Sequence, residues 1–167
     1  MDLDDRPELW SGSVDFIADS AYMSRPPMPP TFVFLLDVSK MAVDSGYLTQ
    51  ATSTIKGILD EGTLPGGERT RVAFIAFDHK LYYFNLKSTL KQPQMLVMTD
   101  LTDNLLPQPD DLLVNLHDSY DIISQLLDNF PAYFSESNSN ANESALVPAM
   151  ATAFNICKHI GGRMLLF

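Results

Sequence analysis

The sequence predicts a three-layer α/β fold, in which an open sheet lies between two layers of helices. Short apolar runs rich in aromatic and β-branched residues occupy 31–36, 71–77 and 81–86, and such runs are typical of buried strands. Segments in which apolar residues recur at helical spacing lie between the predicted strands. Strands that alternate with helices in this way favour right-handed crossovers and a sheet covered on both faces.

The chain is predicted to consist of a lead-in, residues 1–30, and a single domain, residues 31–167. In the lead-in, the segment 13–18 partly alternates between polar and apolar residues, which suits a short edge strand. The segment 25–30 contains four prolines, which lack amide donors and favour an extended connector. The strand that begins at Thr31 therefore opens the domain.

A helix and a strand hairpin are predicted to follow this first strand. Residues 47–60 carry an apolar stripe at helical spacing. The run 71–77 is the second central strand, and 81–86 follows it closely enough to form a hairpin. His79 lies in the intervening turn, and we expect it to be exposed. A further short strand is predicted at 94–99.

Two helices and a last strand complete the predicted fold. The first helix runs from about Asp118 to Phe130, because Pro131 is expected to end or break it. The second helix is capped by Ser144. Its apolar residues are Leu146, Met150, Phe154 and Ile156. The segment 163–167 begins a strand, and because native domains seldom end inside a buried strand, we expect the chain to be a fragment.

Composition argues against several classes of protein. The net charge is −10, from 21 acidic and 11 basic residues, whereas proteins that bind nucleic acids or membrane surfaces need clustered lysine and arginine. No apolar run reaches the roughly 18 residues of a membrane helix, and the acidic N-terminus is not a secretory signal. The single cysteine, Cys157, can form no internal disulfide, which favours a cytosolic location. Its apolar neighbours predict a core residue.

Asp37 and Ser39 follow the first strand, at the edge where open α/β sheets carry functional groups. A von Willebrand factor A-type metal site would place Asp-x-Ser-x-Ser here, with oxygen ligands for a hard cation such as magnesium. The third position is Met41, whose thioether is too soft for that ion, and Lys40 adds a positive charge. We therefore predict no working metal site and regard Asp37, Ser39 and Met41 as degenerate positions of one.

Two other interpretations of this pair of residues remain. An aspartyl-phosphate hydrolase needs Asp-x-Asp, with one carboxylate as nucleophile and the other as acid, and Ser39 cannot serve as that acid. In a purely structural role, Asp37 and Ser39 would hydrogen-bond to amides of the loop and the helix end. We favour the structural role, because position in a fold does not establish function. No catalytic or cofactor-binding residue is predicted.

Several phrases, taken in order, resemble one family. They are 25–30 (Arg-Pro-Pro-Met-Pro-Pro), 34–39 (Phe-Leu-Leu-Asp-Val-Ser), 46–48, 64–66, 69–74, 83–86, 92–96 (Gln-Pro-Gln-Met-Leu), 106–109 and 112–116 (Leu-Leu-Val-Asn-Leu). The set is similar to the trunk domain of the cargo-adaptor subunit of the COPII vesicle coat, from about Arg6 to the C-terminus. The resemblance implies a von Willebrand A-like fold without a working metal site.

The resemblance also implies a non-enzymatic role in transport from the endoplasmic reticulum to the Golgi. The trunk would pair with the coat's GTPase-activating sister subunit, and the full subunit would bind cytosolic tails of membrane cargo. Contact with the small coat GTPase would be indirect. The protein would be peripheral to the membrane, at the cytosolic face of endoplasmic reticulum exit sites, with no nucleic-acid partner.

No cofactor is implied for this chain, because the zinc finger of the family precedes the trunk. The alternative from another class is an independent von Willebrand A-type domain that binds a protein ligand through a divalent cation.

Overall fold

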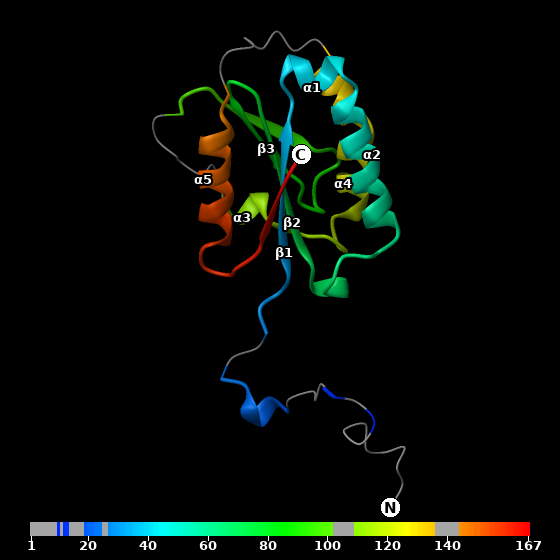
Figure 1. Ribbon diagram of the computed structural model, residues 1–167, viewed down its shortest axis with the longest axis vertical. Helices are drawn as coiled ribbons and strands as arrows, with labels where there is room; N and C mark the ends of the chain where they lie inside the picture. The colour runs from blue at the N-terminus through cyan, green and yellow to red at the C-terminus, as the bar shows by residue number, and fades with distance from the viewer. Residues whose placement is uncertain (1–9, 11, 14–18, 25–26, 102–108, 136–143) are drawn as a thin grey trace, which may run out of the picture.

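A computed structural model describes residues 10, 12–13, 19–24, 27–101, 109–135 and 144–167. Its centre is a six-stranded sheet with the strand order β4-β3-β2-β1-β6, and β5 pairs with β2. Helices α2 and α4 cover one face of the sheet, and α3 and α5 cover the other (Figure 1). The predicted three-layer α/β fold is confirmed.

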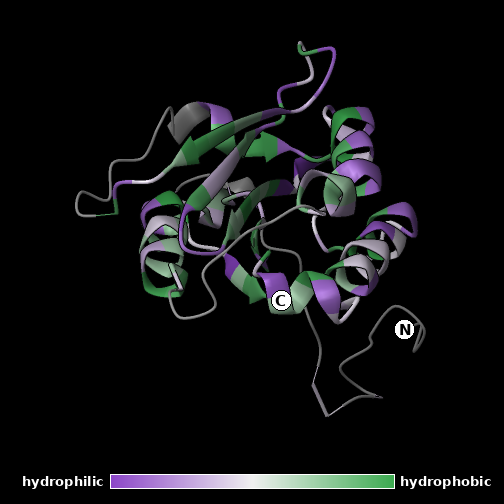
Figure 2. Ribbon diagram, turned by 90° about the horizontal axis from the view of Figure 1, so that it is seen from above, coloured by the Kyte–Doolittle hydropathy of each residue, from purple (hydrophilic) through white to green (hydrophobic). Residues whose placement is uncertain are grey.

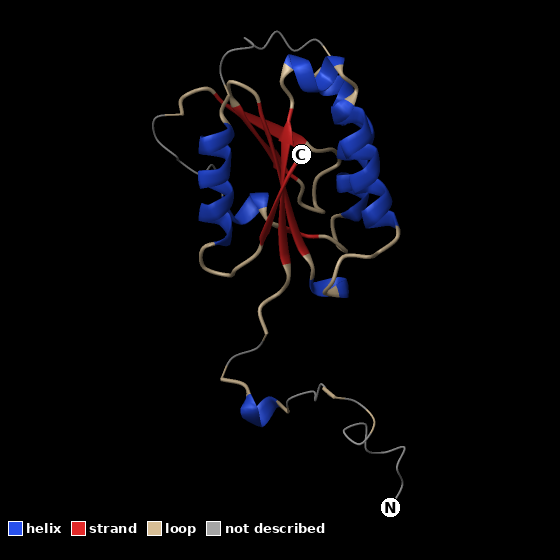
Figure 3. Ribbon diagram, in the orientation of Figure 1, coloured by secondary structure: helices blue, strands red, loops and turns tan. Residues whose placement is uncertain are grey.

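Figure 3 distinguishes the helices, in blue, from the strands, in red. In chain order the elements are η3 (Ser20–Tyr22), β1 (Thr31–Asp37), α1 (Lys40–Asp44), α2 (Tyr47–Asp60), η4 (Gly67–Arg69), β2 (Arg71–Phe77), β3 (Leu81–Asn85), β4 (Gln94–Met98), α3 (Pro109–Leu112), β5 (Val114–Asn115), α4 (Tyr120–Tyr133), α5 (Leu146–Cys157) and β6 (Arg163–Leu166).

Strand β1 lies between two parallel neighbours. It pairs with β2 on one side, with Phe34 opposite Phe74, and with β6 on the other, with Phe34 opposite Leu165. Strands β3 and β4 extend the sheet beyond β2 in antiparallel fashion. Helix α2 follows β1 on one face and α5 precedes β6 on the other, so the chain diverges at the carboxyl end of β1. Open α/β sheets place ligand sites at such a point.

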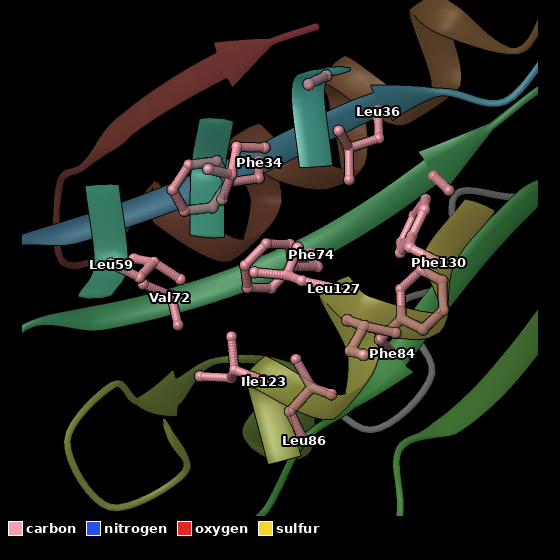
Figure 4. Packing of buried hydrophobic residues seen from close by; sticks show 14 of the residues in the cluster. Phe34, Leu36, Leu59, Val72, Phe74, Phe84, Leu86, Ile123, Leu127 and Phe130 are labelled. Carbon is pink, nitrogen blue, oxygen red and sulfur yellow. The ribbon is translucent and has the colours of Figure 1, made fainter. Parts of the chain in front are cut away.

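The face beneath α2 and α4 is packed with aromatic side chains (Figure 4). The rings of Phe34 and Phe74 stack with their centroids 4.9 Å apart. Phe84 of β3 meets Phe130 of α4 at 5.3 Å, and Phe130 in turn meets Phe134 at 5.3 Å. Seen from above, the mostly hydrophobic strands lie between the helical layers (Figure 2). Burial on both faces explains why β1 and β2 read as continuous apolar runs.

Helix α5 presents small residues to the opposite face of the sheet. Its buried residues are Ala149, Thr152, Ala153 and Cys157. Met150 and Phe154, which we had assigned to the apolar stripe of this helix, are 44% and 61% exposed. The small side chains let the helix approach the strands closely, and the Thr152 hydroxyl lies 3.2 Å from the hydroxyl of Tyr83. The predicted stripe was therefore wrong for its two largest residues.

Helix α4 passes through Pro131 and ends at Tyr133, contrary to the prediction that Pro131 would end or break it. The proline lies in the last turn, where its missing N–H removes only one helical bond. Phe130 and Phe134 are both buried around it and hold this turn against the sheet.

One unpredicted helix and two expectations concern the element boundaries. The short helix α1, which begins after the N-cap Ser39, was not predicted from the sequence. Ser144 accepts a hydrogen bond from the Leu146 amide at 3.3 Å, although the N-cap position of α5 is Ala145. The edge strand predicted at 13–18 lies largely outside the described residues.

Candidate functional site at the carboxyl ends of the central strands

Two aspartates lie side by side at the carboxyl ends of the parallel strands β1 and β2. Asp37 is the last residue of β1 and pairs in register with Phe77, the last residue of β2. Asp78 follows Phe77 directly, and its side chain is 2% exposed. This is the edge at which the sequence predicted functional groups.

The carboxylate of Asp37 closes the turn that leads into α1. Its Oδ1 accepts a hydrogen bond from the Ser39 amide at 2.7 Å. The Ser39 hydroxyl in turn accepts the amide of Ala42 at 3.4 Å, which satisfies one of the free N–H groups at the start of α1. Both side chains therefore have backbone partners within their own turn.

Met41, the third degenerate position, lies on α1 with its side chain 76% exposed. Across the part of the chain that the structure describes, no three His, Cys, Asp or Glu side chains are grouped so that they could hold a metal ion. The absence of a working metal site remains a prediction, which the Asp37 experiment below tests.

Asp78 is the residue that the sequence reasoning overlooked. Its Oδ1 accepts the Lys80 amide at 2.7 Å, and its Oδ2 accepts the Tyr82 hydroxyl at 3.0 Å. Its backbone carbonyl accepts the amide of Ala145 at 2.6 Å, which ties the β2–β3 hairpin to the start of α5. An acid directly after a buried strand was the signal that could have found it, since Asp37 shows the same pattern.

The environment of Asp78 affects the titration of its tyrosine partner. Burial raises the pKa of Tyr82 well above its ordinary value, and the negative charge and hydrogen bond of Asp78 raise it further. A phenolate beside a buried carboxylate would place two negative charges in contact, so the hydroxyl keeps its proton.

His79 was expected to be exposed, and this expectation was wrong. Its side chain is 24% exposed, and Nδ1 lies 3.2 Å from Oδ2 of Asp78. Nδ1 is buried and makes no hydrogen bond in the structure. The hairpin folds the ring back against the strand end, so the turn position did not bring the side chain into solvent.

The sequence of this scaffold matches one family over most of its length. The model of the Sec23/Sec24 trunk domain matches residues 27–167. The chain belongs to the Sec23/Sec24 trunk domain family. The trunk match begins just before the first central strand and includes all six strands of the sheet.

Relatives of this trunk chain are protein transport proteins. SEC24 A of Arabidopsis thaliana is 49% identical over all of this chain, and Sec24B of Homo sapiens is 45% identical over 97% of it. The crystal structure of the human COPII-coat protein Sec24c superposes on 84% of the chain with a TM-score of 0.74 and 33% identity. The chain spans only 16%, 12% and 19% of these three proteins, respectively.

The strand ends of the trunk domain carry local hydrogen bonds. Asp37 and Asp78 each accept an amide two residues further along the chain, and Asp78 also accepts the Tyr82 hydroxyl. Such contacts stabilise turns and fix the loops that join sheet and helices. None of the described helices is long and apolar enough to cross a membrane.

Proposed function

We propose that this chain is the trunk of a COPII coat subunit that pairs with the GTPase-activating coat subunit and helps to select cargo. It acts without catalysis in vesicle transport from the endoplasmic reticulum to the Golgi. The observation that carries the proposal is 49% identity over the whole chain to a protein transport protein. The likeness to a COPII-coat protein of known structure supports it.

In this proposal the chain supplies one part of a larger protein. Residues 31–167 belong to the trunk domain and residues 1–30 lead into it. Cytosolic tails of membrane cargo bind the full subunit, the small coat GTPase is reached indirectly, and the protein is peripheral to the membrane at endoplasmic reticulum exit sites. A zinc finger, if the full protein follows the family, precedes the trunk.

The hydrogen bonds that the two strand-end aspartates accept support a non-enzymatic role. The carboxylates of Asp37 and Asp78 are engaged by donors of their own turns. An aspartate nucleophile also needs an acid that protonates the leaving group, and Ser39, two residues after Asp37, cannot serve as that acid. The two acids serve better as fixed points for the loops of a protein-binding scaffold.

Copurification with the GTPase-activating sister subunit tests the proposed pairing. The chain, extended to the complete trunk, is immobilised and incubated with the sister subunit, and an immobilised A-type domain from outside the family is the control. We expect stoichiometric retention by the trunk alone. No retention by the complete trunk would contradict the proposal.

Calorimetry with magnesium and manganese tests the prediction of no metal site. We expect no tight binding by the wild-type chain and no difference in Asp37→Ala. Stoichiometric binding that disappears in Asp37→Ala would instead establish an A-type domain that works through a divalent cation.

A further inference from the structure

Strand β4 forms one edge of the sheet. It lies beside β3 and has no strand on its other side in the part of the chain that the structure describes. The backbone N–H and C=O groups that point outward along β4 therefore have no backbone partner among the described residues. A row of free backbone donors and acceptors is a template for another strand, so the chemistry of this edge selects an extended segment as its partner.

The side chains of β4 leave both faces of the strand partly open. Met95 and Val97 lie on the face that α2 and α4 cover, because they pair with β3 residues that pack there, yet they are 43% and 51% exposed. Leu96 lies on the other face and is 37% exposed. Neither helical layer covers β4 fully, so an added strand would bury apolar side chains on both faces.

The edge also lacks the features that normally protect an edge strand from pairing. Natural proteins protect such strands with a charged residue, a proline or a bulge, or by making them very short. The residues of β4, Gln94–Met98, include no charge and no proline, and they pair with β3 in continuous register without a bulge. A length of five residues is usual for a strand. The edge is therefore open to pairing.

The edge is complementary to itself when two copies meet in antiparallel fashion about a two-fold axis at Leu96, the middle residue of β4. The two Leu96 side chains then face each other. Met95 of each copy lies opposite Val97 of the other, on the opposite face of the joined sheet. All three exposed apolar residues of the edge gain an apolar neighbour in this register.

The charges that flank β4 have opposite signs at its two ends. Lys91 precedes the strand and Asp100 follows it, and both are exposed. An antiparallel second copy brings Lys91 of each chain to the end of the contact at which Asp100 of the other chain lies. A parallel second copy would instead bring like charges together. The charge pattern therefore favours the antiparallel arrangement that the two-fold axis requires.

We propose that β4 pairs with β4 of a second copy of this chain, antiparallel and centred on Leu96, so that the two sheets join into one. The contact is a single pair of short strands and belongs with small, transient interfaces, so we expect a dissociation constant of about 10–500 µM. The contact uses no residue of the strand-end site, and the inference does not rest on the proposed coat function.

Sedimentation equilibrium of the 167-residue chain tests for this dimer. We expect a reversible change from monomer to dimer as the protein concentration rises from about 5 µM to about 500 µM. Leu96→Lys places two ammonium groups opposite each other at the two-fold axis and should weaken the dimer at least about tenfold. A monomer at every concentration, assembly beyond a dimer, or an unaffected dimer in Leu96→Lys would each overturn the proposal.

Met164→Lys is the matched control for the charge. It adds the same charge at an exposed residue of β6, which forms the opposite edge of the sheet. We expect this variant to dimerise like the wild type, and circular dichroism checks that both variants keep the fold. Loss of the dimer in Met164→Lys would assign the contact to the β6 edge and overturn the proposal.

Disulfide formation tests the register without relying on a charge. Directly opposed residues of an antiparallel pair have Cβ atoms about 4.5–5.5 Å apart, whereas an offset of two residues gives about 7–8 Å. Leu96→Cys should therefore form a disulfide-linked dimer under mild oxidation at least about tenfold faster than Met95→Cys, whose exposure is similar. The wild type, with its buried Cys157, gives the background rate. Equal rates, or faster cross-linking of Met95→Cys, would overturn the proposal.

Discussion

Asp37 and Asp78 are both aspartates at strand ends, but they differ in burial and in the number of hydrogen bonds that they accept. Asp37 is only partly buried and supports the turn into α1 through the Ser39 amide. Asp78 is almost fully buried and holds two turn contacts, while its carbonyl holds the first residue before α5. Burial of a carboxylate destabilises the fold unless hydrogen-bond donors surround it. The hydrogen bond from the Tyr82 hydroxyl therefore helps to stabilise the buried Asp78.

Tyr82→Phe should lower the free energy of unfolding by about 1–2 kcal/mol at neutral pH, because it leaves a buried carboxylate oxygen without its donor. The folded-state pKa of Tyr82 lies above the value of about 10 in the unfolded chain, so the unfolded chain loses its proton first as pH rises. This contribution is complete below about pH 10 and is lost above it. Urea unfolding at several alkaline pH values measures the effect.

The matched control for this substitution is Tyr47→Phe, since Tyr47 is 47% exposed. We expect its stability curve to follow the wild type, and the Tyr82→Phe curve to fall less steeply above pH 10. Identical slopes in wild type and Tyr82→Phe would show that the tyrosine–aspartate contact does not govern alkaline stability.

Helix α5 illustrates how packing selects a face that periodicity leaves open. The helix is apolar around most of its circumference, so the sequence offers two candidate faces. The sheet accepts the one with Ala149, Ala153 and Cys157, because small residues permit close approach and their burial costs little side-chain entropy. Phe154 remains 61% exposed as a result.

Truncating two phenylalanines tests this choice of face. Phe154→Ala should change the free energy of unfolding by no more than about 0.5 kcal/mol, as for other exposed positions. Phe130→Ala should cost about 3–5 kcal/mol, because Phe130 is fully buried between Phe84 and Phe134. Chemical denaturation of both variants gives the comparison, and a large loss in Phe154→Ala would place that ring in the core.

The long elements could be predicted from the sequence, because burial of each one produces a regular pattern of apolar residues. The apolar runs gave β1 and β2, and the helical stripe gave α2, within one or two residues. Pro131 was misjudged because Phe130 and Phe134 hold the last turn of α4 through tertiary contacts. Local propensity yields to such packing routinely.

At the scale of the whole molecule, the order of strands and helices was sufficient to predict three layers around an open sheet. The position of Asp37 could also be predicted, because it follows from the end of a buried run. The contact between the Asp78 carbonyl and the Ala145 amide could not, since it joins residues far apart in the chain. No periodic pattern encodes a contact of that kind.

Strand β6 lies close to α5, so the rate at which a reagent modifies the single thiol reports how often this part of the fold opens. Cys157 is 8% exposed, burial raises the pKa of its thiol, and a Cβ atom added at Gly162 would lie only 2.9 Å from its sulfur. A thiol reagent should therefore modify the native chain at least about a hundredfold more slowly than the urea-unfolded chain. Equal modification rates in the native and the unfolded chain would mean that α5 and β6 separate freely. A slower rate in the native chain would measure how often they separate.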